Sequence, residues 1–301
     1  MKIGNELEFL EKIKSKLDRT VKYIFLSRGQ VIEFSYIDKN DGKDIICAPT
    51  QTACRLGCKF CFLSDYDLEV RNLTPEEISI QIHYISKDLG LFNGNNSARV
   101  LLVSYMGCGE PLLNIENVML ASESVKKRYS SHYGVVRFAV ASLIPNLIAM
   151  YNFIAFVLEF ELLFKFHLSL HSPDAEKRKF LMPAASPIES SIKLVKIFTD
   201  STGNSAEIHY SLIDDINDSD KDASQLAALL AGLGIPVKIL VYNEKPNLDF
   251  RHSEKVARFR SILEAGGIKT EFYHPPGWDI GSSCGQFLMD YYEKYNKRKS
   301  A

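Results

Sequence analysis

The sequence predicts an α/β protein built on a parallel sheet or barrel. Short β-rich segments alternate with longer segments whose apolar residues recur at helical spacing. We expect strands at 100–104, 135–141, 166–170, 208–212, 237–241 and 270–273, and helices near 75–89, 115–128, 187–199, 220–233 and 252–265. Helices of this length between strands favour parallel pairing. The chain has 301 residues, 46% of them hydrophobic, which is enough for a large core.

The N-terminal region predicts a small separate element. Residues 4–18 carry Leu7, Leu10, Ile13 and Leu17 at helical spacing and predict a short helix. Residues 21–37 predict two strands around a turn at Arg28-Gly29-Gln30. We therefore expect a small helix-plus-β extension over 1–46 and a catalytic domain over 47–301.

Charge and hydropathy exclude two broad classes of protein. The net charge is 36 − 37 = −1, so only local basic patches could hold a nucleic acid. The most apolar stretch, 143–166, is interrupted by Pro145, Asn146 and Glu159, so it predicts buried core and not a membrane span. The six cysteines lack the spacing of a secreted disulfide scaffold. We expect a cytoplasmic protein without membrane contact.

Three cysteines form the most informative motif. Cys54, Cys58 and Cys61 are spaced C-x3-C-x2-C on a loop that includes Gly57. Thiolates are the usual ligands of iron–sulfur clusters, and three of them leave one iron of a [4Fe–4S] cube open to a small chelating molecule. A structural zinc site with Cys47 as fourth ligand is the alternative, and buried inert thiols are a third reading.

The segment CRLGCKFC resembles the signature loop of radical S-adenosylmethionine enzymes. With Cys47 included, the spacing is similar to that of the RNA adenine methyltransferases of that superfamily, the RlmN/Cfr type. Further matches follow in family order at 71–74, 106–112, 169–173, 216–219, 242–243 and 279–286. The resemblance covers about residues 20 to 290. It implies a partial (β/α)6 TIM-like barrel, the radical S-adenosylmethionine core, with a small N-terminal β/helix extension.

The resemblance also implies the chemistry. Cys54, Cys58 and Cys61 would hold a [4Fe–4S] cluster, and S-adenosylmethionine would be both methyl donor and radical source. Cys284 would take a methyl group, and a 5′-deoxyadenosyl radical would activate that group for addition to carbon 2 or 8 of adenine. Cys47 would then release the product by attacking the Cys284 sulfur, leaving a disulfide between the two. Glu33 matches the family's proposed proton acceptor.

Contacts to the cofactor follow from the same motifs. Gly109 and Glu110 would hold the methionine amino group. Ser169, His171 and Asn243, each at a strand end, would hold the ribose and carboxylate. For one further serine of the family, Ala141 falls nearest to the expected place, and the adjacent Ser142 is the candidate. Cys108, inside the glycine motif, is expected to serve packing.

Two departures bear on the substrate. Relatives usually carry an additional N-terminal helical domain, which we expect to be missing here, and they have arginines where this chain has Tyr273-His274-Pro275-Pro276. Basic candidates for RNA contact are 126–128, 177–179, Arg258 with Arg260, and 294–299. We expect an RNA substrate (rRNA or tRNA), an electron donor such as flavodoxin or ferredoxin, and a monomer. The alternatives are a radical enzyme with a different substrate and a non-catalytic, metal-bound or RNA-binding descendant.

Overall fold

The computed structural model describes residues 2–3, 7–66, 68–91, 96–245, 248–283 and 285–286. Their strands form one 11-stranded sheet in chain order, β1 to β11. The N-terminal strands pair antiparallel: β1 (Lys2–Ile3), β2 (Leu7–Lys14), β3 (Val21–Ser27), β4 (Gln30–Asp38) and β5 (Lys43–Cys47). From β5 onward all pairs are parallel: β6 (Asn96–Tyr105), β7 (Tyr133–Ser142), β8 (Phe164–Ser169), β9 (Ser205–Leu212), β10 (Val237–Val241) and β11 (Thr270–Tyr273).

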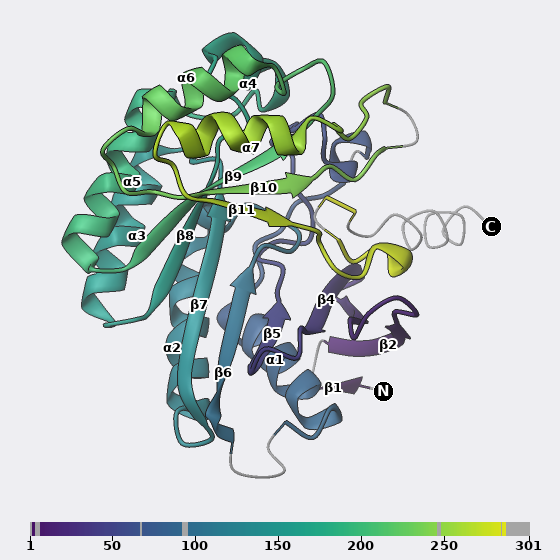
Figure 1. Ribbon diagram of the computed structural model, residues 1–301. Coiled ribbons are helices and arrows are strands. Elements are labelled where there is room, and N and C mark those ends of the chain that lie inside the picture. Colours follow the sequence, from purple (N-terminus) through teal and green to yellow (C-terminus); the bar gives the residue numbers. More distant parts are fainter. Residues whose placement is uncertain are drawn as a thin grey trace.

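Helices follow the parallel strands and cover the outer face of the curved sheet (Figure 1). They are α1 (Pro75–Asp88), α2 (Ile115–Tyr129), α3 (Leu147–Glu159), α4 (Ala175–Leu181), α5 (Ile188–Thr202), α6 (Asp220–Leu230) and α7 (Val256–Ala265). A reciprocal cap between Thr74 and Glu77 begins α1, as the sequence indicates. Strands β5 to β10 each lead to a covering helix, so the predicted partial (β/α)6 barrel is confirmed.

The core lies between sheet and helices. Phe153 of α3 packs on Phe164 of β8 and on Phe198 of α5, with ring centroids 5.2 and 5.4 Å apart. Segment 143–166 therefore contributes side chains to the core, as predicted, but other residues of the segment are exposed. Within the described residues, no helix is long and apolar enough to cross a membrane. Helix α3 was not predicted, because it also exposes apolar residues such as Ile148 and Tyr151 and so shows little amphipathic periodicity.

The expected helix at 4–18 is wrong. Residues 7–14 are strand β2, which pairs antiparallel with β3. The register shifts between Phe9 and Glu11, a bulge that changes the facing of the side chains. Leu7 therefore joins the main core, whereas Leu10 and Ile13 pack on a second cluster. This spacing of three across a bulge imitates a helical pattern.

The predicted hairpin is confirmed as β3 and β4. Arg28 and Gly29 both have positive φ, 48° and 80°, as a tight two-residue turn requires. The next pairing, β4 with β5, places Ser35 opposite Cys47. Because β5 also pairs with β6, the N-terminal strands and the barrel share one sheet. The domain division at residue 46 stays a prediction.

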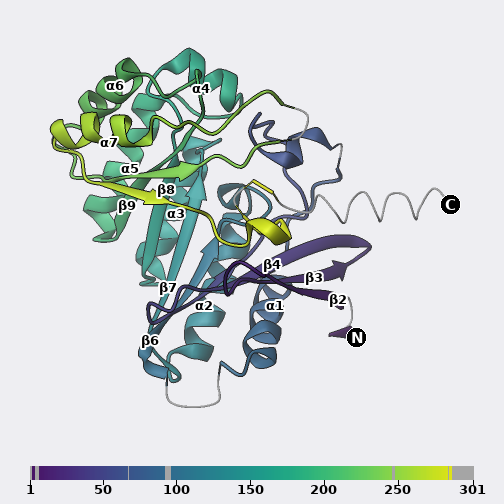
Figure 2. The same cartoon turned by 45° about the vertical axis from the view of Figure 1, so that its right-hand side comes forward.

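A segment after β11 crosses from the barrel to the N-terminal strands (Figure 2). The backbone N–H of Gly277 donates to Asp18 Oδ2 at 2.8 Å, and that of Lys16 donates to Asp279 Oδ2 at 2.8 Å. The hydroxyls of Ser282 and Ser35 are hydrogen-bonded. These contacts bring the 279–286 motif to the pair of strands that ends at Cys47.

Candidate active site

Cys54, Cys58 and Cys61 lie in the loop 48–61, here called the cysteine loop. It follows β5 and leads into the short 3-10 helix η1 (Phe62–Asp65). Burial raises the pKa of Cys54 to about 12 and that of Cys58 well above its ordinary value, and the charge of Cys61 raises both further. The pKa of Cys61 is also raised by burial. Backbone N–H groups of Leu56 and Leu63 hydrogen-bond to Cys54 and Cys61 and oppose this rise. The loop thus gathers three partly buried thiols in surroundings that disfavour free thiolates.

This donor set suits an iron–sulfur cluster. A bound cluster would replace the three protons, and the N–H donors would stabilise the metal-bound sulfurs. Cys47, the fourth ligand of the zinc alternative, is instead the last residue of β5, where it pairs with Ser35 and Ser104. The three loop cysteines, without Cys47, are therefore the residues that would hold the cluster.

The glycine motif after β6 lies directly against the beginning of the cysteine loop. A Cβ on Gly109 would lie 2.7 Å from Gln51 Cβ, and Gly109 has a φ of +101°. The backbone N–H of Thr50 donates to the Cys108 carbonyl at 2.9 Å, and the Glu110 N–H donates to Gln51 Oε1 at 2.9 Å. Only glycine fits this approach. Cys108 is buried in the small cluster behind it, which agrees with a packing role.

Glu110 is buried at the mouth of the barrel. Its carboxylate accepts hydrogen bonds from the backbone N–H groups of Leu112 (3.1 Å) and Leu143 (3.4 Å). Burial raises its pKa to about 7, while a hydrogen bond from Ser142 opposes the rise. Its charge raises the pKa of Cys54 and Cys58, so carboxylate and thiols are neighbours. The carboxylate is therefore placed where it could meet an ammonium group beside a cluster.

The end of β8 supplies Ser169 and, two residues later, His171. His171 is buried, accepts the Ser211 N–H on Nδ1 at 2.9 Å, and lies against Phe60 of the cysteine loop. Burial lowers its pKa to about 3. Ser169 ends β8, and its carbonyl accepts from Arg178 at 3.3 Å. Arg178 also donates to the Leu143 carbonyl at 3.2 Å, so it joins two strand ends at this site.

The end of β10 supplies a cation that sequence reasoning missed. Asn243, a predicted cofactor contact, is buried just after the strand. Two residues later, Lys245 is buried and donates to the cysteine loop and η1. No motif in the sequence marks Lys245, because an isolated lysine in a loop is usually solvated. Arg178 was missed for a related reason, since it is part of a basic run that suggested RNA contact.

Cys47 borders a cavity of about 650 Å³ inside the barrel. Ser282 and Ser283 line the same cavity, so the segment that precedes Cys284 lies beside Cys47. On the other side of that position, the Gly285 carbonyl accepts from Phe62 N–H at 3.0 Å, which ties the motif to the cysteine loop. Cys284 itself lies outside the described residues.

Glu33 lies on β4, two residues before Ser35, so its side chain shares a face of the sheet with Ser35 and Cys47. It is buried and ion-paired with Lys22 at 3.2 Å. The Lys22 Nζ in turn lies close to Gly281 of the C-terminal motif. The predicted proton acceptor is thus a buried carboxylate, paired with a lysine, on the sheet face that also carries Cys47.

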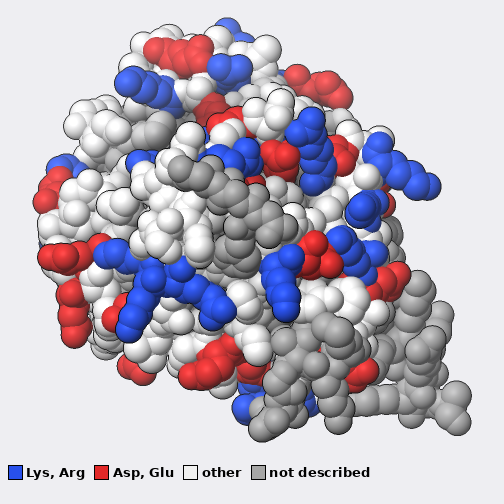
Figure 3. All heavy atoms as spheres, turned by 90° about the horizontal axis from the view of Figure 1, so that it is seen from below, with Lys and Arg blue, Asp and Glu red and all other residues white. Residues whose placement is uncertain are grey.

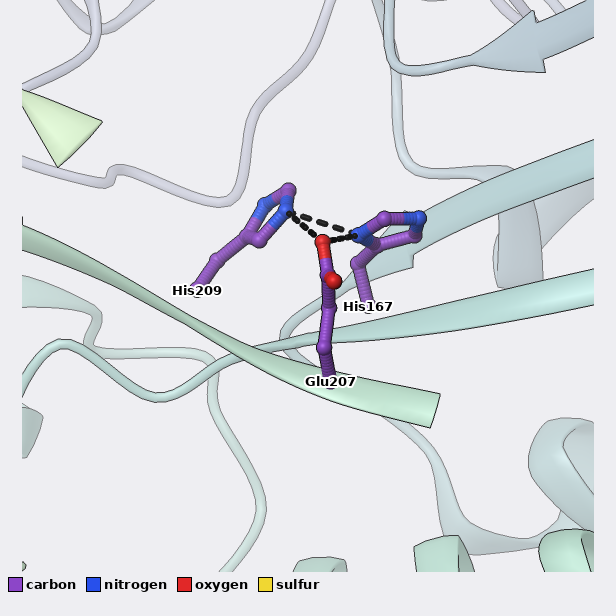
Figure 4. Close-up of side chains that lie close together, drawn as sticks. All are labelled: His167, Glu207 and His209. Atoms are coloured by element: carbon purple, nitrogen blue, oxygen red, sulfur yellow. Dashed lines mark hydrogen bonds and ion pairs between the residues drawn. The ribbon is translucent and has the colours of Figure 1, made fainter. Parts of the chain in front are cut away.

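The floor of the cavity holds a buried polar cluster that the sequence did not indicate (Figure 4). Glu207 Oε1 lies 2.7 Å from His167 Nδ1 and 3.3 Å from His209 Nε2. Burial opposes ionisation of Glu207, but these hydrogen bonds outweigh it and hold its pKa well below the usual range. Lys165 and Lys238 pair with the same carboxylate. The two lysines already neutralise the charge of Glu207. This group of side chains is therefore a hydrogen-bonded ion-pair network and a poor site for a metal cation.

The basic candidates for RNA contact differ in their environments. Lys177 pairs with Asp222, and Arg258 pairs with Asp220. Arg260 pairs with Glu264. Residues 294–299 lie outside the described residues. Seen from below, basic and acidic side chains alternate and form no continuous basic face (Figure 3). Among these candidates, 126–128 at the end of α2 keep three adjacent cations.

Sequence comparison identifies known relatives of this chain. A probable dual-specificity RNA methyltransferase RlmN from Clostridium botulinum (strain Eklund 17B / Type B) is 34% identical over 298 residues, covering 97% of this chain and 81% of the relative. The probable RlmN of Thermotoga neapolitana is also 34% identical, over 94% of this chain and 80% of its own length. No family model matches the chain.

Solved structures give the same result. A crystal structure of a radical SAM methyltransferase from Sphaerobacter thermophilus matches 93% of this chain and 81% of its own, with a TM-score of 0.81 and 28% identity. Streptococcus suis SuiB bound to S-adenosylmethionine shares the fold at a TM-score of 0.53 and 19% identity, covering 77% of this chain and 52% of its own. Fold and site define a radical S-adenosylmethionine methyltransferase, whose cofactors are a [4Fe–4S] cluster and S-adenosylmethionine.

Within that class, the chain belongs to the RlmN family.

Proposed function

We propose that this enzyme methylates an sp2 carbon of adenine, carbon 2 or carbon 8, in rRNA or tRNA. The observation that carries the proposal is the 34% identity over 97% of the chain to a relative named as a dual-specificity RNA methyltransferase. The substrate could then reach Cys47 through the cavity that this residue borders.

The roles of the residues follow from their places. The cluster and S-adenosylmethionine supply the radical chemistry when bound. Cys54, Cys58 and Cys61 hold the cluster, and Gly109 with Glu110 holds the methionine amino group. Ser142, Ser169, His171 and Asn243 surround the rest of that molecule at the strand ends.

Two further cysteines act on the base. Cys284 carries the methyl group, and the Cys47 thiolate attacks the Cys284 sulfur to release the methylated base. That attack forms one S–S bond and breaks the S–C bond. The electron pair of the S–C bond stays on the carbon of the product, which takes up a proton to become the methyl group, and a reductant must then restore both thiols. Glu33, which is paired with Lys22 and lies on the same face as Cys47, accepts the ring proton.

Peptide mass spectrometry tests the carrier step. Anaerobically reconstituted protein is incubated with isotope-labelled S-adenosylmethionine, and we expect a labelled methyl on Cys284. The Cys47→Ala variant with RNA should accumulate a covalent protein–RNA adduct, and Cys108→Ala is the control that should not. An unmodified Cys284 in cluster-loaded protein would overturn the proposal.

We further infer that the enzyme works in the cytoplasm, because its RNA substrates and its reductant, flavodoxin or ferredoxin, are found there. We also infer that it works as a monomer. Nucleoside analysis of treated rRNA and tRNA distinguishes the two RNA classes and the two carbons. Methylation of neither would favour the alternative of a radical enzyme with another substrate.

A further inference from the structure

Lys245 forms an unusually complete set of contacts with the cysteine loop. Its Nζ donates to the carbonyls of Lys59 (3.1 Å) and Cys61 (3.0 Å), to Ser64 Oγ (3.0 Å) and to Asp65 Oδ1 (2.7 Å). Its side chain is only 3% exposed. A buried ammonium with four acceptors on one loop fixes both the loop and a positive charge beside Cys61.

The positive charge lies directly beside Cys61, because the Lys245 Nζ donates to the Cys61 carbonyl at 3.0 Å. Asp65 pairs with this ammonium at 2.7 Å, but its side chain is 38% exposed. Water therefore screens the carboxylate more than the buried ammonium, and the positive charge of the pair dominates at Cys61.

We propose that Lys245 is a positioning residue that raises the reduction potential of the iron–sulfur cluster and so eases its reduction by one electron. The reduction potential of a cluster depends on nearby charge, hydrogen bonding and solvent exposure. A reduced cluster carries one more negative charge, so a fixed cation in a dry site stabilises the reduced form more than the oxidised form. The inference rests on the proposed function only in taking Cys61 as a cluster ligand.

Opposite charge changes separate this role from a structural one. Lys245→Met should lower the midpoint potential of the cluster, and Asp65→Asn should raise it. Lys245→Arg should restore the wild-type value. A merely structural clamp predicts shifts of the same sign, or none, for Lys245→Met and Asp65→Asn, because both weaken the same contact.

Lys59→Met is the matched control. Lys59 lies in the same loop, but its Nζ lies over the Phe180 ring at 4.0 Å and its side chain is exposed. Removing this solvated charge changes the net charge by the same amount as Lys245→Met. Because water screens it, the midpoint potential should remain near the wild-type value.

The measurement is a dithionite titration with redox mediators, followed by electron paramagnetic resonance of the reduced cluster. It uses the full reconstituted chain, first assayed for iron and without RNA. At the wild-type midpoint, we expect the reduced-to-oxidised ratio of Lys245→Met to fall about tenfold, about 59 mV for a one-electron couple. Equal shifts for Lys59→Met and Lys245→Met, or an unshifted or lowered potential for Asp65→Asn, would overturn the inference.

Failure of the proposed function has a different signature. If the protein binds four irons and shows these shifts in potential but methylates no RNA, the role of Lys245 is supported and the proposed RNA substrate is wrong. If the protein methylates RNA but the midpoint potentials of the variants equal the wild-type value, only the proposed role of Lys245 is wrong.

Discussion

The ring of Phe60 lies against the edge of the His171 ring, with 4.7 Å between their centroids and 62° between their planes. Phe60 directly precedes Cys61, and His171 follows the end of β8. The contact therefore joins the cysteine loop to the strand end on the other side of the candidate site. Because burial lowers the pKa of His171 to about 3, the ring is neutral at physiological pH and acts as a fixed acceptor.

Replacing His171 by alanine should destabilise the protein. The Ser211 N–H, which now donates to His171 Nδ1 at 2.9 Å, would lose its acceptor in a buried place. An unsatisfied buried donor costs about 1–3 kcal/mol, so we expect the free energy of unfolding to fall by that amount in urea titrations. His132→Ala, on the exposed surface, should change it by less than about 0.5 kcal/mol. Equal values for the two variants would contradict this account.

Gly109→Ala should disrupt the approach of the glycine motif to the cysteine loop. The added Cβ would meet Gln51 Cβ at 2.7 Å and its backbone N at 2.8 Å, and backbone cannot move aside cheaply. We expect reduced iron content after reconstitution and a lower melting temperature. Gly29→Ala is the matched control, since Gly29 also has positive φ but no atom within 4 Å of the new Cβ. It should lose only about 1–2 kcal/mol of stability and keep its iron.

The strand and helix order of the barrel could be predicted because its signals are local. Strands β10 and β11 were predicted with the bounds observed, and α1 begins at the predicted residue, Pro75. Strand β2 could not be predicted, because its bulge depends on pairing with β3, which no local pattern reveals. Helix α4 was not predicted, because it is short and its basic run 177–179 was interpreted as a candidate for RNA contact.

The site was predictable only in part for the same reason. Gly109, Glu110 and the three loop cysteines lie within recognisable motifs, so their types could be read from sequence. Gln51 accepts the Glu110 N–H from another loop, and Lys245 reaches Cys61 across 184 positions. Such contacts depend on the tertiary fold, and neither residue type is unusual where it occurs.

Affinity for S-adenosylmethionine should increase with pH between about 6 and 8. Burial raises the pKa of Glu110 to about 7, so in the empty site the carboxyl is partly protonated at neutral pH. Pairing with the methionine ammonium requires the ionised form, so binding releases a proton and strengthens as pH rises. Calorimetry in buffers of different ionisation enthalpy measures that proton release. Glu110→Gln should bind S-adenosylmethionine more weakly and lose the pH dependence. If this variant kept a steep pH dependence, the titrating group would be a residue other than Glu110.

The same shift has a consequence for folding without cofactor. A carboxyl whose folded pKa is raised binds its proton more tightly when folded, so its contribution favours folding below the unfolded pKa of 4.5. That contribution is lost as pH rises from 4.5 through about 7. Relative to Glu110→Gln, the cofactor-free wild type should therefore lose stability across this interval, as measured by urea titrations at several pH values. A constant difference between the two proteins would show that Glu110 keeps an ordinary pKa.

Arg178→Met should separate the ends of β7 and β8. The buried guanidinium donates to the carbonyls of Leu143, Ser169 and Ser186, which belong to three different segments. Burial lowers its pKa to about 10, so it remains charged at neutral pH, and methionine would leave these carbonyls without their donor. Because hydrogen bonds to a charged group contribute about 1.5–3 kcal/mol, we expect a loss of about 3 kcal/mol in unfolding free energy. Lys179→Met, on the exposed side of the same helix, should change it little; a similar loss there would mean that α4, and not the bridge between strand ends, is the sensitive element.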